Sequence, residues 1–218
     1  MTEAERVSFE KVKAWLESDE IDLKELMSYF RCAMMETETK FNVLDEEFSL
    51  VYDQNPIETI KTRLKTIDSI AEKIVRKNYP LDIATLENLV TDIAGIRVIC
   101  SFTSDIYKIA NAFLKQDDVK LIQQKDYIKK PKENGYRSLH LVVSIPIFLY
   151  DRKKMMNVEV QFRTIAMDCW ASLEHKIRYK KNLEADENTD SELYGCAMLC
   201  AELDERMDKI HTTDKKEN

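Results

Sequence analysis

Glycine is scarce in this chain. Only Gly95, Gly135 and Gly195 occur among 218 residues, and they lie far apart. A Walker loop needs two glycines about five residues apart, and a dinucleotide-binding turn needs a closely spaced set, so neither motif can be built. If the protein holds phosphate groups, cationic side chains must do much of the work that backbone amides do in those folds.

The sequence also lacks a membrane segment, a disulfide framework and a zinc-binding cluster. No apolar run approaches the roughly 20 residues that cross a bilayer, and the polar N-terminal stretch does not resemble a signal peptide. The five cysteines have no framework spacing, and the three histidines form no cluster with cysteine at metal-ligand spacing. We therefore expect a cytoplasmic protein with reduced thiols and no membrane partner.

Negative charge prevails, but positive charge is concentrated locally. The formal net charge of −7 argues against a protein that coats nucleic acid, so no stable nucleic acid partner is expected. The stretch "KDYIKKPKENGYRSLHLVV" (125–143) gathers lysines around a rare glycine. Gly135 permits a sharp turn there, and Tyr136 offers a ring on which a base can stack. The stretch indicates a nucleotide site; the alternative is a lysine-rich hairpin with an incidental tyrosine.

The order of predicted elements indicates an α+β fold, with a mixed central β-sheet flanked by helices and long helices at both ends. Helices are expected over 21–51, 57–77, 84–90, 104–116, 165–181 and 191–210. Strands are expected after Gly95 and over 119–124, 138–148 and 156–164. Ser104 and Thr164 are placed to cap the helices that follow them. Residues 1–54 form N-terminal helices, and 183–218 form a C-terminal helix with a disordered tail, in one compact unit with the centre.

Two of these helices carry apolar stripes. Over 21–51 apolar residues recur at spacings of four and three, with Thr37 as the one polar member. Such a seam needs a partner helix, within the fold or across a subunit interface. The stripe of the last helix consists of Leu193, Cys196, Cys200, Leu203, Met207 and Ile210. We interpret Cys196 and Cys200 as core residues.

The helix predicted over 57–77, between Pro56 and Pro80, is basic on one side. Its helical wheel places four polar residues within one arc: Lys65, Ser69, Lys73 and Arg76. By itself this pattern is most simply a solvated face. Arg63 differs because it falls inside the apolar arc, where a guanidinium must be paired or must lie flat against something planar.

Two carboxylates are candidates for chemistry. Asp92 directly precedes the strand "IAGIRV", and Glu159 lies mid-strand on the face that it shares with Gln161 and Arg163. A strand face with three polar side chains is either solvated or lines a site. Two carboxylates on neighbouring strands would form a Mg²⁺ site of the kind that keeps waters and substrate phosphates as further ligands.

Five stretches together resemble the synthetase domain of the (p)ppGpp synthetases of the RelA/SpoT family. They are "TRLKTIDSIAEKIVRK", "DIAGIRVICSF", "KDYIKKPKENGYRSLHLVV", "VEVQFRTIAMDCWASLEHKIRYK" and "LDERM". The resemblance assigns 55–182 to a (p)ppGpp synthetase catalytic domain. The long bifunctional members add a hydrolase domain and regulatory modules, for which 218 residues leave no room. The chain is therefore identified as a small alarmone synthetase, more similar to the RelP type than to the RelQ type.

The resemblance implies a GTP pyrophosphokinase of the stringent response. Such an enzyme transfers the β,γ-pyrophosphate of ATP to the 3′-hydroxyl of GDP or GTP and releases AMP. Glu159 would activate that hydroxyl, and Asp92 and Glu159 would bind Mg²⁺. The residues that match the ATP site are Arg63, Lys65, Ser69, Lys73, Arg76 and Arg97, of which the two arginines Arg63 and Arg97 sandwich the adenine. The residues that match the GDP/GTP site are Lys125, Lys132, Tyr136, His140, Gln161 and Asp168, with Tyr136 stacked on the guanine.

The resemblance also implies a homotetramer, which would use the two apolar stripes. Two positions depart from the family pattern. Gln123 opens the run before the lysine-rich loop, so the rules for GDP against GTP preference that rest on this run do not transfer. Asp168 stands where RelQ-type members have an asparagine near the guanine.

Two rival functions stay open on the sequence alone. One is a catalytically silent module that binds a nucleotide or single-stranded RNA on the same fold. The other is a nucleotidyltransferase of related fold, which would release pyrophosphate instead of AMP.

Overall fold

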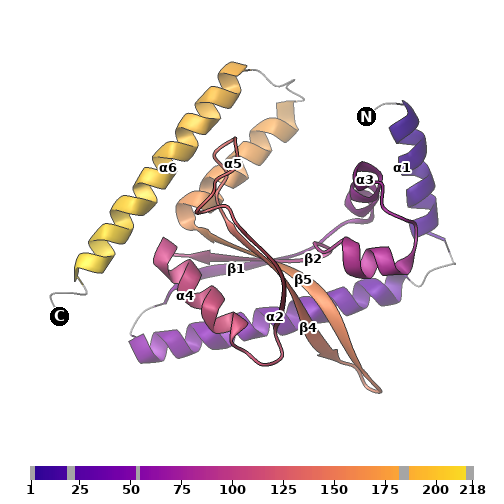
Figure 1. Cartoon of the computed structure of the whole chain (residues 1–218), viewed down its shortest axis with the longest axis horizontal. Helices are drawn as coiled ribbons and strands as arrows, with labels where there is room; N and C mark the ends of the chain where they lie inside the picture. The colour runs from indigo at the N-terminus through magenta and orange to yellow at the C-terminus, as the bar shows by residue number, and fades with distance from the viewer. Residues whose placement is uncertain (1–2, 19–22, 53–54, 182–186, 215–218) are drawn as a thin grey trace.

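A computed structural model describes residues 3–18, 23–52, 55–181 and 187–214, arranged around one five-stranded sheet (Figure 1). The strands are β1 (Ile57–Leu64), β2 (Ala94–Cys100), β3 (Lys120–Asp126), β4 (Leu139–Phe148) and β5 (Lys153–Thr164). The helices are α1 (Glu3–Leu16), α2 (Leu23–Tyr52), α3 (Ile67–Lys77), the π-helical turn η1 (Thr85–Leu89), α4 (Thr103–Leu114), α5 (Ile165–Lys181) and α6 (Glu187–Asp214). The predicted α+β class is confirmed.

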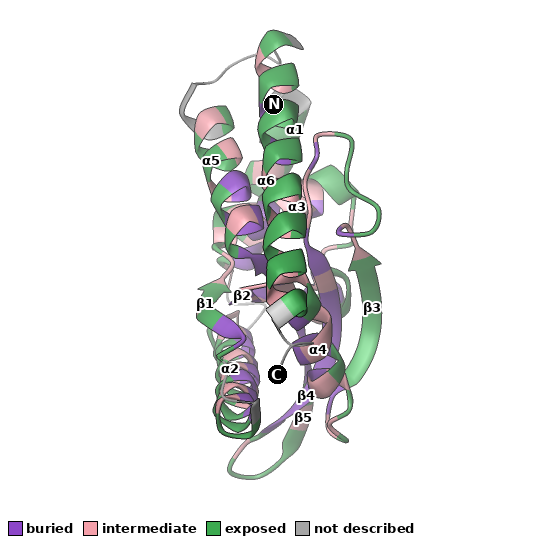
Figure 2. Cartoon of the chain, turned by 90° about the vertical axis from the view of Figure 1, so that its left-hand side faces the viewer, coloured by how far each residue is buried: buried purple, intermediate pink, exposed green. Residues whose placement is uncertain are grey.

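The sheet is mixed, and its two faces differ in character. The strand order is β1-β2-β5-β4-β3, in which β2 and β5 form the one parallel pair. Along β5, Val158, Val160 and Phe162 are fully buried, whereas Glu159 and Gln161 are half-buried. Successive side chains of a strand point to opposite faces, so one face of the sheet is apolar and the other presents the polar side chains. Figure 2 shows β4 largely buried and the edge strand β3 largely exposed.

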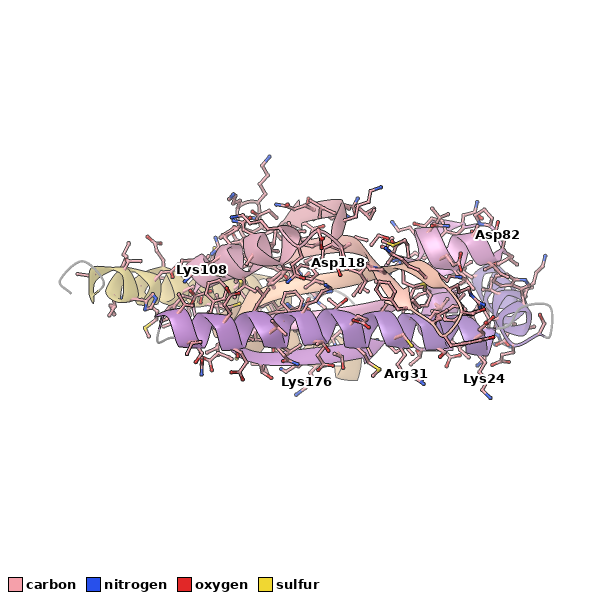
Figure 3. All side chains as sticks on the ribbon, turned by 90° about the horizontal axis from the view of Figure 1, so that it is seen from below. Lys24, Arg31, Asp82, Lys108, Asp118 and Lys176 are labelled. Atoms are coloured by element: carbon pink, nitrogen blue, oxygen red, sulfur yellow. The ribbon has the colours of Figure 1, made fainter. Side chains whose placement is uncertain are left out.

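Helix α2 lies across the apolar face, beneath the sheet in Figure 1. Its Phe41 ring lies 4.5 Å from the ring of Phe113 on α4 and 5.6 Å from that of Phe162 on β5, measured between centroids. Lys24 and Arg31 lie on the exposed side of the helix (Figure 3). The stripe of α2 therefore packs mainly on the sheet of its own chain, and the predicted partner helix is limited to the short contact with α4.

Thr37, the polar member of that stripe, has its hydroxyl hydrogen-bonded although it is buried. Thr37 is fully buried, and its hydroxyl donates to the carbonyl oxygen of Ala33 at 2.8 Å. A threonine in a helix interior satisfies its hydroxyl in this way, by bonding to the carbonyl one turn earlier. Thr37 thus reads as a core residue of α2.

The single helix predicted over 57–77 is wrong. Residues 57–64 form β1, which pairs antiparallel with β2, and α3 begins only at Ile67. Thr66 has an extended backbone, and its hydroxyl accepts from the amide of Ser69 at 3.3 Å, which marks the true start of the helix. The sequence "IETIKTRL" is rich in β-branched residues, which favour a strand. Arg63 consequently lies on an exposed strand and not within an apolar helical arc.

Helix α6 packs side by side with α5 (Figure 1), but through a different face from the one predicted. Leu193 and Ala197 are buried and Cys200 is half-buried, whereas Cys196 is exposed. The interpretation of Cys196 as a core residue is therefore wrong. The helix continues to Asp214, into the segment predicted as a disordered tail, of which 215–218 lie outside the described residues.

The far end of α6 rests on the start of α4. The His211 ring stacks on Phe102 with centroids 3.9 Å apart, and Ser104 Oγ donates to Asp208 Oδ1 at 3.2 Å. Ser104 was predicted to cap α4, but the helix begins at Thr103 and Phe102 provides no side-chain cap. By contrast, the predicted cap of α5 is present, since Thr164 Oγ1 accepts from the amide of Met167 at 3.1 Å. No helix in the described part of the chain is long and apolar enough to cross a membrane.

One carboxyl on α6 should make stability depend on pH. Burial, aided by the nearby charge of Asp208, raises the pKa of Asp204 from 3.8 to about 6, although a hydrogen bond from Thr164 opposes the rise. Because the pKa of this carboxyl is higher in the folded protein than in the unfolded chain, protonation favours the folded state. This contribution to stability is fully present below the unfolded pKa of 3.8 and is lost as the pH rises through about 6.

We therefore expect Asp204→Asn to be more stable than the wild type at pH 8, by about 1 to 2 kcal/mol after allowance for solvent screening. The difference should shrink as the pH falls to 5. Urea unfolding at both pH values measures it. Glu202→Gln, on an exposed part of the same helix, is the control and should show no such trend. An Asp204→Asn difference that is constant with pH would contradict the expectation.

Candidate active site

The register of the strands places two rows of side chains side by side on the polar face of the sheet. Partners across a ladder point to the same face. One row crosses all five strands as Lys61, Arg97, Gln161, His140 and Lys125. The next row runs Arg63, Gly95, Glu159, Val142 and Gln123. Residues more than 90 positions apart in the chain therefore form one continuous surface.

One cavity lies over β1, β2 and β5 and has a volume of about 240 Å³. Its lining includes five residues predicted for the ATP site or the metal: Arg63, Lys65, Asp92, Arg97 and Glu159. Glu159 and Gln161 complete its wall on the β5 side. Lys61, which the sequence did not single out, also lines this cavity.

A second cavity, of about 220 Å³, lies over β3, β4 and β5. Three of its lining residues were predicted for the GDP/GTP site: Lys125, Lys132 and His140. Lys73, predicted for the ATP phosphates, faces this second cavity. Glu159 lines both cavities, so the predicted catalytic carboxylate stands where the two meet.

Asp92 lies in the turn before β2 and is held by two lysines. Its Oδ2 accepts from Lys65 Nζ at 3.0 Å and its Oδ1 from Lys73 Nζ at 2.8 Å. Burial alone would raise the pKa of Asp92, but the hydrogen bonds and charges of the two lysines outweigh it and lower the pKa below its usual value. The group is therefore an ionised carboxylate at neutral pH.

Glu159 receives a neighbour on each carboxylate oxygen. Its Oε1 lies 3.3 Å from His140 Nδ1, and its Oε2 accepts from Gln161 Nε2 at 2.9 Å. Burial, and to a smaller degree the charge of Asp92, would raise its pKa. The hydrogen bond from His140, the charge of that ring when protonated and the bond from Gln161 together lower it below its usual value. Glu159 is thus also ionised, and can accept a proton or bind a cation.

The lysine-rich loop makes the turn that the sequence predicts. Gly135 has a positive φ of 83°, and its amide donates to the carbonyl oxygen of Lys132 at 2.8 Å. Lys132 Nζ lies 4.7 Å from the ring centroid of Tyr136 and 4.8 Å from that of Tyr127. The loop therefore brings a cation and two aromatic rings to the edge of the second cavity.

Tyr136 is tied to both sides of the site. Its hydroxyl lies 2.9 Å from His140 Nε2 and accepts from Arg163 Nη2 at 2.9 Å. Its ring packs near Trp170 of α5, with centroids 6.5 Å apart. The position of this ring thus depends on α5 as well as on the loop.

Asp168, in the first turn of α5, is surrounded by cations. Its Oδ1 accepts from Arg97 Nη1 and from Arg163 Nη1, each at 3.0 Å, and its Oδ2 from Lys61 Nζ at 2.9 Å. Burial would raise the pKa of this carboxyl, but Lys61 and the two arginines lower it. The residue was predicted to contact guanine; in this structure its carboxylate orients two arginines, and the contact with guanine stays a prediction.

Two predicted ATP-site residues lie outside both cavities. Ser69 is in the first turn of α3, where its Oγ accepts from the hydroxyl of Thr66 at 3.0 Å. Arg76 is exposed in the last turn of the same helix. Their predicted roles require ATP phosphates to extend toward α3.

Sequence reasoning missed two cationic residues. Lys61 was hidden by the mistaken helix, since only a strand aligns it with Arg63 on the site face. Arg163 was placed on the right strand face but given no role, although it is 5% exposed and makes three hydrogen bonds. Its alternation with Glu159 and Gln161 was the signal that could have identified it.

Comparison with known proteins shows the family. A model of the region found in RelA and SpoT proteins matches residues 62–184. The chain belongs to the RelA/SpoT family. It is 42% identical to the GTP pyrophosphokinase YwaC of Bacillus subtilis over 186 residues, which are 85% of this chain and 89% of that protein. It is 36% identical to the GTP pyrophosphokinase YjbM of the same organism, over 83% of this chain and 84% of that one.

Solved structures agree with the sequence relatives. Small alarmone synthetase 2 of Bacillus subtilis matches with a TM-score of 0.80 and 41% identity, over 88% of this chain and 100% of that chain. Small alarmone synthetase 1 of the same organism, bound to its product pppGpp, matches with a TM-score of 0.79 and 34% identity, over 87% and 96%. The predicted membership in the small alarmone synthetases, and with it the enzyme class of GTP pyrophosphokinase, is confirmed.

Proposed function

We propose that this RelA/SpoT protein transfers the β,γ-pyrophosphate of ATP to the 3′-hydroxyl of GDP or GTP, so that (p)ppGpp and AMP are formed. The observation that carries the proposal is the pair of cavities that meet at Glu159. A transfer between two nucleotides needs both substrates to be held with their reacting atoms adjacent. The shared carboxylate lies at the one place where an acceptor hydroxyl and a donor phosphate would meet.

The first cavity is the donor site. Arg63 and Arg97, on adjacent strands, hold the adenine between their guanidinium planes, a use for which arginine is suited by its flat, delocalised charge. Lys65 in this cavity and Lys73 in the second cavity bind the phosphates from either side of Asp92, with Ser69 and Arg76 toward the outer end. Phosphoryl transfer needs little covalent chemistry from the protein, because fixed cations that neutralise the polyphosphate lower the barrier.

The second cavity is the acceptor site. Lys125 and Lys132 bind the acceptor phosphates, and Tyr136, which is bonded to His140 of this cavity, stacks on the guanine. Gln161 lines the first cavity next to Glu159 and lies beside the reacting ribose. His140 was predicted to contact phosphate, but both its ring nitrogens are already engaged, by Tyr136 and Glu159. Its role is therefore to support Glu159, and Asp168 supports the arginines that border the guanine.

Glu159 takes the proton of the 3′-hydroxyl. The oxygen then attacks the β-phosphorus of ATP, a new oxygen–phosphorus bond forms, and the bond to the oxygen that bridges toward the α-phosphorus breaks. AMP leaves with that bridging oxygen. Glu159 is ionised and lines both cavities, so it can accept this proton where the two substrates meet.

Asp92 and Glu159 fit a divalent cation, which we propose is Mg²⁺. They are two ionised carboxylates on the wall of one cavity. The negative charge of each makes ionisation of the other less favourable, and a cation between them would remove this repulsion. Within the described residues, no group of three His, Cys, Asp or Glu could hold a metal alone. Mg²⁺ commonly takes one or two carboxylates and completes its shell with waters and substrate phosphates. When bound, the ion would neutralise charge on the transferred phosphates.

Incubation with ATP, Mg²⁺ and GDP or GTP tests the proposed reaction. AMP and a 3′-pyrophosphorylated guanosine nucleotide should form in equal amounts. Binding of nucleotides without AMP, weakened steeply by salt, would favour the silent nucleotide- or RNA-binding module. Release of pyrophosphate in place of AMP would identify the nucleotidyltransferase.

We further propose a homotetramer. Of the two stripes, that of α2 is occupied by the sheet, whereas α6 leaves Leu199, Leu203, Met207 and Ile210 between 47% and 66% exposed. A row of large apolar side chains on one helix is a typical contact surface between subunits. Light scattering at micromolar concentration should give four chain masses; the mass of one chain would contradict the proposal.

A further inference from the structure

Arg163 occupies an unusual position for a cation. It is the one lysine or arginine in the buried set of the described residues, with 5% exposure. Buried charges are costly unless they are paired and hydrogen-bonded. Asp168 supplies the opposite charge, through Arg163 Nη1 at 3.0 Å. That ion pair leaves the second terminal nitrogen free to serve another purpose.

The second nitrogen, Nη2, donates to two groups of the acceptor side. It lies 2.9 Å from the hydroxyl oxygen of Tyr136 and 3.1 Å from Oε1 of Gln161. The guanidinium carbon also lies 5.3 Å from the Tyr136 ring centroid. One buried side chain therefore holds both the predicted guanine platform and the glutamine beside the ribose.

Two hydrogen-bond chains start at Arg163 and end at Glu159. The first passes from Gln161 Nε2 to Glu159 Oε2, 2.9 Å apart. The second passes through the Tyr136 hydroxyl to His140 Nε2 at 2.9 Å, and from His140 Nδ1 to Glu159 Oε1 at 3.3 Å. Each oxygen of the carboxylate thus ends one chain.

The chemistry of the end groups fixes the direction of both chains. A guanidinium has only donors, and an ionised carboxylate has only acceptors. Gln161 must therefore turn its oxygen to Arg163 and its amino group to Glu159. Along the other chain, Tyr136 accepts from Arg163. When the His140 ring is neutral, Tyr136 donates to its Nε2 and the ring carries its proton on Nδ1.

The geometry points to Arg163 as a positioning residue that anchors the donor ends of two hydrogen-bond chains converging on the catalytic carboxylate Glu159. The inference deepens the proposed pyrophosphate transfer and rests on it for the role of Glu159. Arg163 lines neither cavity. It holds Tyr136 and Gln161 directly, and His140 through Tyr136, around the carboxylate of Glu159. Through Asp168 the same guanidinium is linked to Arg97, which lines the donor cavity.

The first test needs only the wild-type protein. The chain has three histidines, so nitrogen-15 spectra of the imidazoles at about pH 8, where free imidazole is neutral, can be assigned. His140 should be found with its proton on Nδ1. A proton on Nε2 would overturn the inference. Because this readout does not involve turnover, it distinguishes failure of the inference from failure of the proposed reaction, which AMP formation reports.

The second test replaces the anchor. Arg163→Met keeps an unbranched side chain as far as the position of Nε but removes the donors, and Asp168 keeps Lys61 and Arg97 as partners, so that no lone buried charge is created. We expect kcat to fall about 10- to 100-fold, with a smaller change in the KM for ATP, because displaced groups misalign the acceptor. The His140 signal should report both tautomers. Arg163→Lys, with one donor point in place of a fork, should recover part of the loss.

Arg152→Met is the matched control. Arg152 also donates to a tyrosine hydroxyl, that of Tyr29 at 2.6 Å, and to a carboxylate, that of Asp151 at 2.9 Å, but it lies outside the site. Its loss should leave kcat and the His140 tautomer unchanged. Wild-type kcat in Arg163→Met, or an equal loss in Arg152→Met, would overturn the inference.

Discussion

Glu159→Gln should bind both nucleotides and turn over almost none. Glutamine has the shape of glutamate and can still meet Gln161 and His140, but it cannot take the proton of the 3′-hydroxyl. Loss of a positioned general base typically lowers the rate about 100- to 10,000-fold. We expect kcat to fall within this range. Calorimetric titration with GDP alone, in which no metal or ATP takes part, should give a dissociation constant close to that of the wild type.

The control for this variant is Glu58→Gln. Glu58 is an exposed glutamate on β1 that accepts from Ser101 Oγ at 2.6 Å, away from both cavities. It should have the wild-type kcat. Near-wild-type turnover in Glu159→Gln would remove Glu159 as the base, whereas loss of GDP binding would mean that the residue mainly shapes the acceptor site.

Gly135→Ala should strongly destabilise the protein and weaken binding of the acceptor nucleotide. A Cβ at this position would lie 2.5 Å from Cβ of Ala197 on α6, an atom that cannot move without its backbone. The positive φ of 83° adds strain for any residue with a side chain. Left-handed strain costs about 1 to 2 kcal/mol and overpacking about 1 to 3 kcal/mol, so we expect a loss of about 2 to 5 kcal/mol in the free energy of unfolding. Because the loop must move away from α6, Tyr136 moves with it, and the KM for GDP or GTP should rise.

Gly195→Ala provides the opposite case in the same neighbourhood. Gly195 lies within α6, and a Cβ there would meet nothing within 4 Å. Alanine in a helix interior is favoured over glycine by about 0.5 to 1 kcal/mol, so this variant should be slightly more stable than the wild type, with unchanged KM values. Urea denaturation of the two variants measures both effects. A Gly135→Ala variant as stable as the wild type would contradict the account of Gly135.

The strands that carry the chemistry could be recognised from the sequence because their signals are local. In "VEVQFRT" the period-two alternation alone places Glu159 and Gln161 on one face and the apolar residues on the other. Likewise, a glycine amid lysines before an apolar run marked the loop at Gly135. The family resemblance then supplied roles that no periodicity contains.

The strand β1 was missed because its signals conflict. "IETIKTRL" contains isoleucines that also fit a helical stripe, and Pro56 stands where prolines often open helices. What makes it a strand is pairing with β2, a partner 30 or more residues away that no local window contains. The face of α6 was misjudged for a related reason. Its buried side includes the small residue Ala197 against the loop and α5, whereas Leu199, Leu203, Met207 and Ile210 are exposed.

The bonds of Lys65 and Lys73 to Asp92 mean that the donor site carries its own counter-ion before any nucleotide arrives. The two ammonium groups are held together in the absence of phosphate, so little side-chain freedom is left to be lost when ATP binds. When ATP enters, its phosphates replace the Asp92 carboxylate as partners of Lys65 and Lys73, so the two lysines are never unpaired cations. Such a replacement depends less on the total charge of the ligand than on whether its phosphate oxygens can occupy the positions of the two Asp92 oxygens. A site on an acidic protein can in this way be strongly basic in its residues while its own carboxylates offset part of that charge.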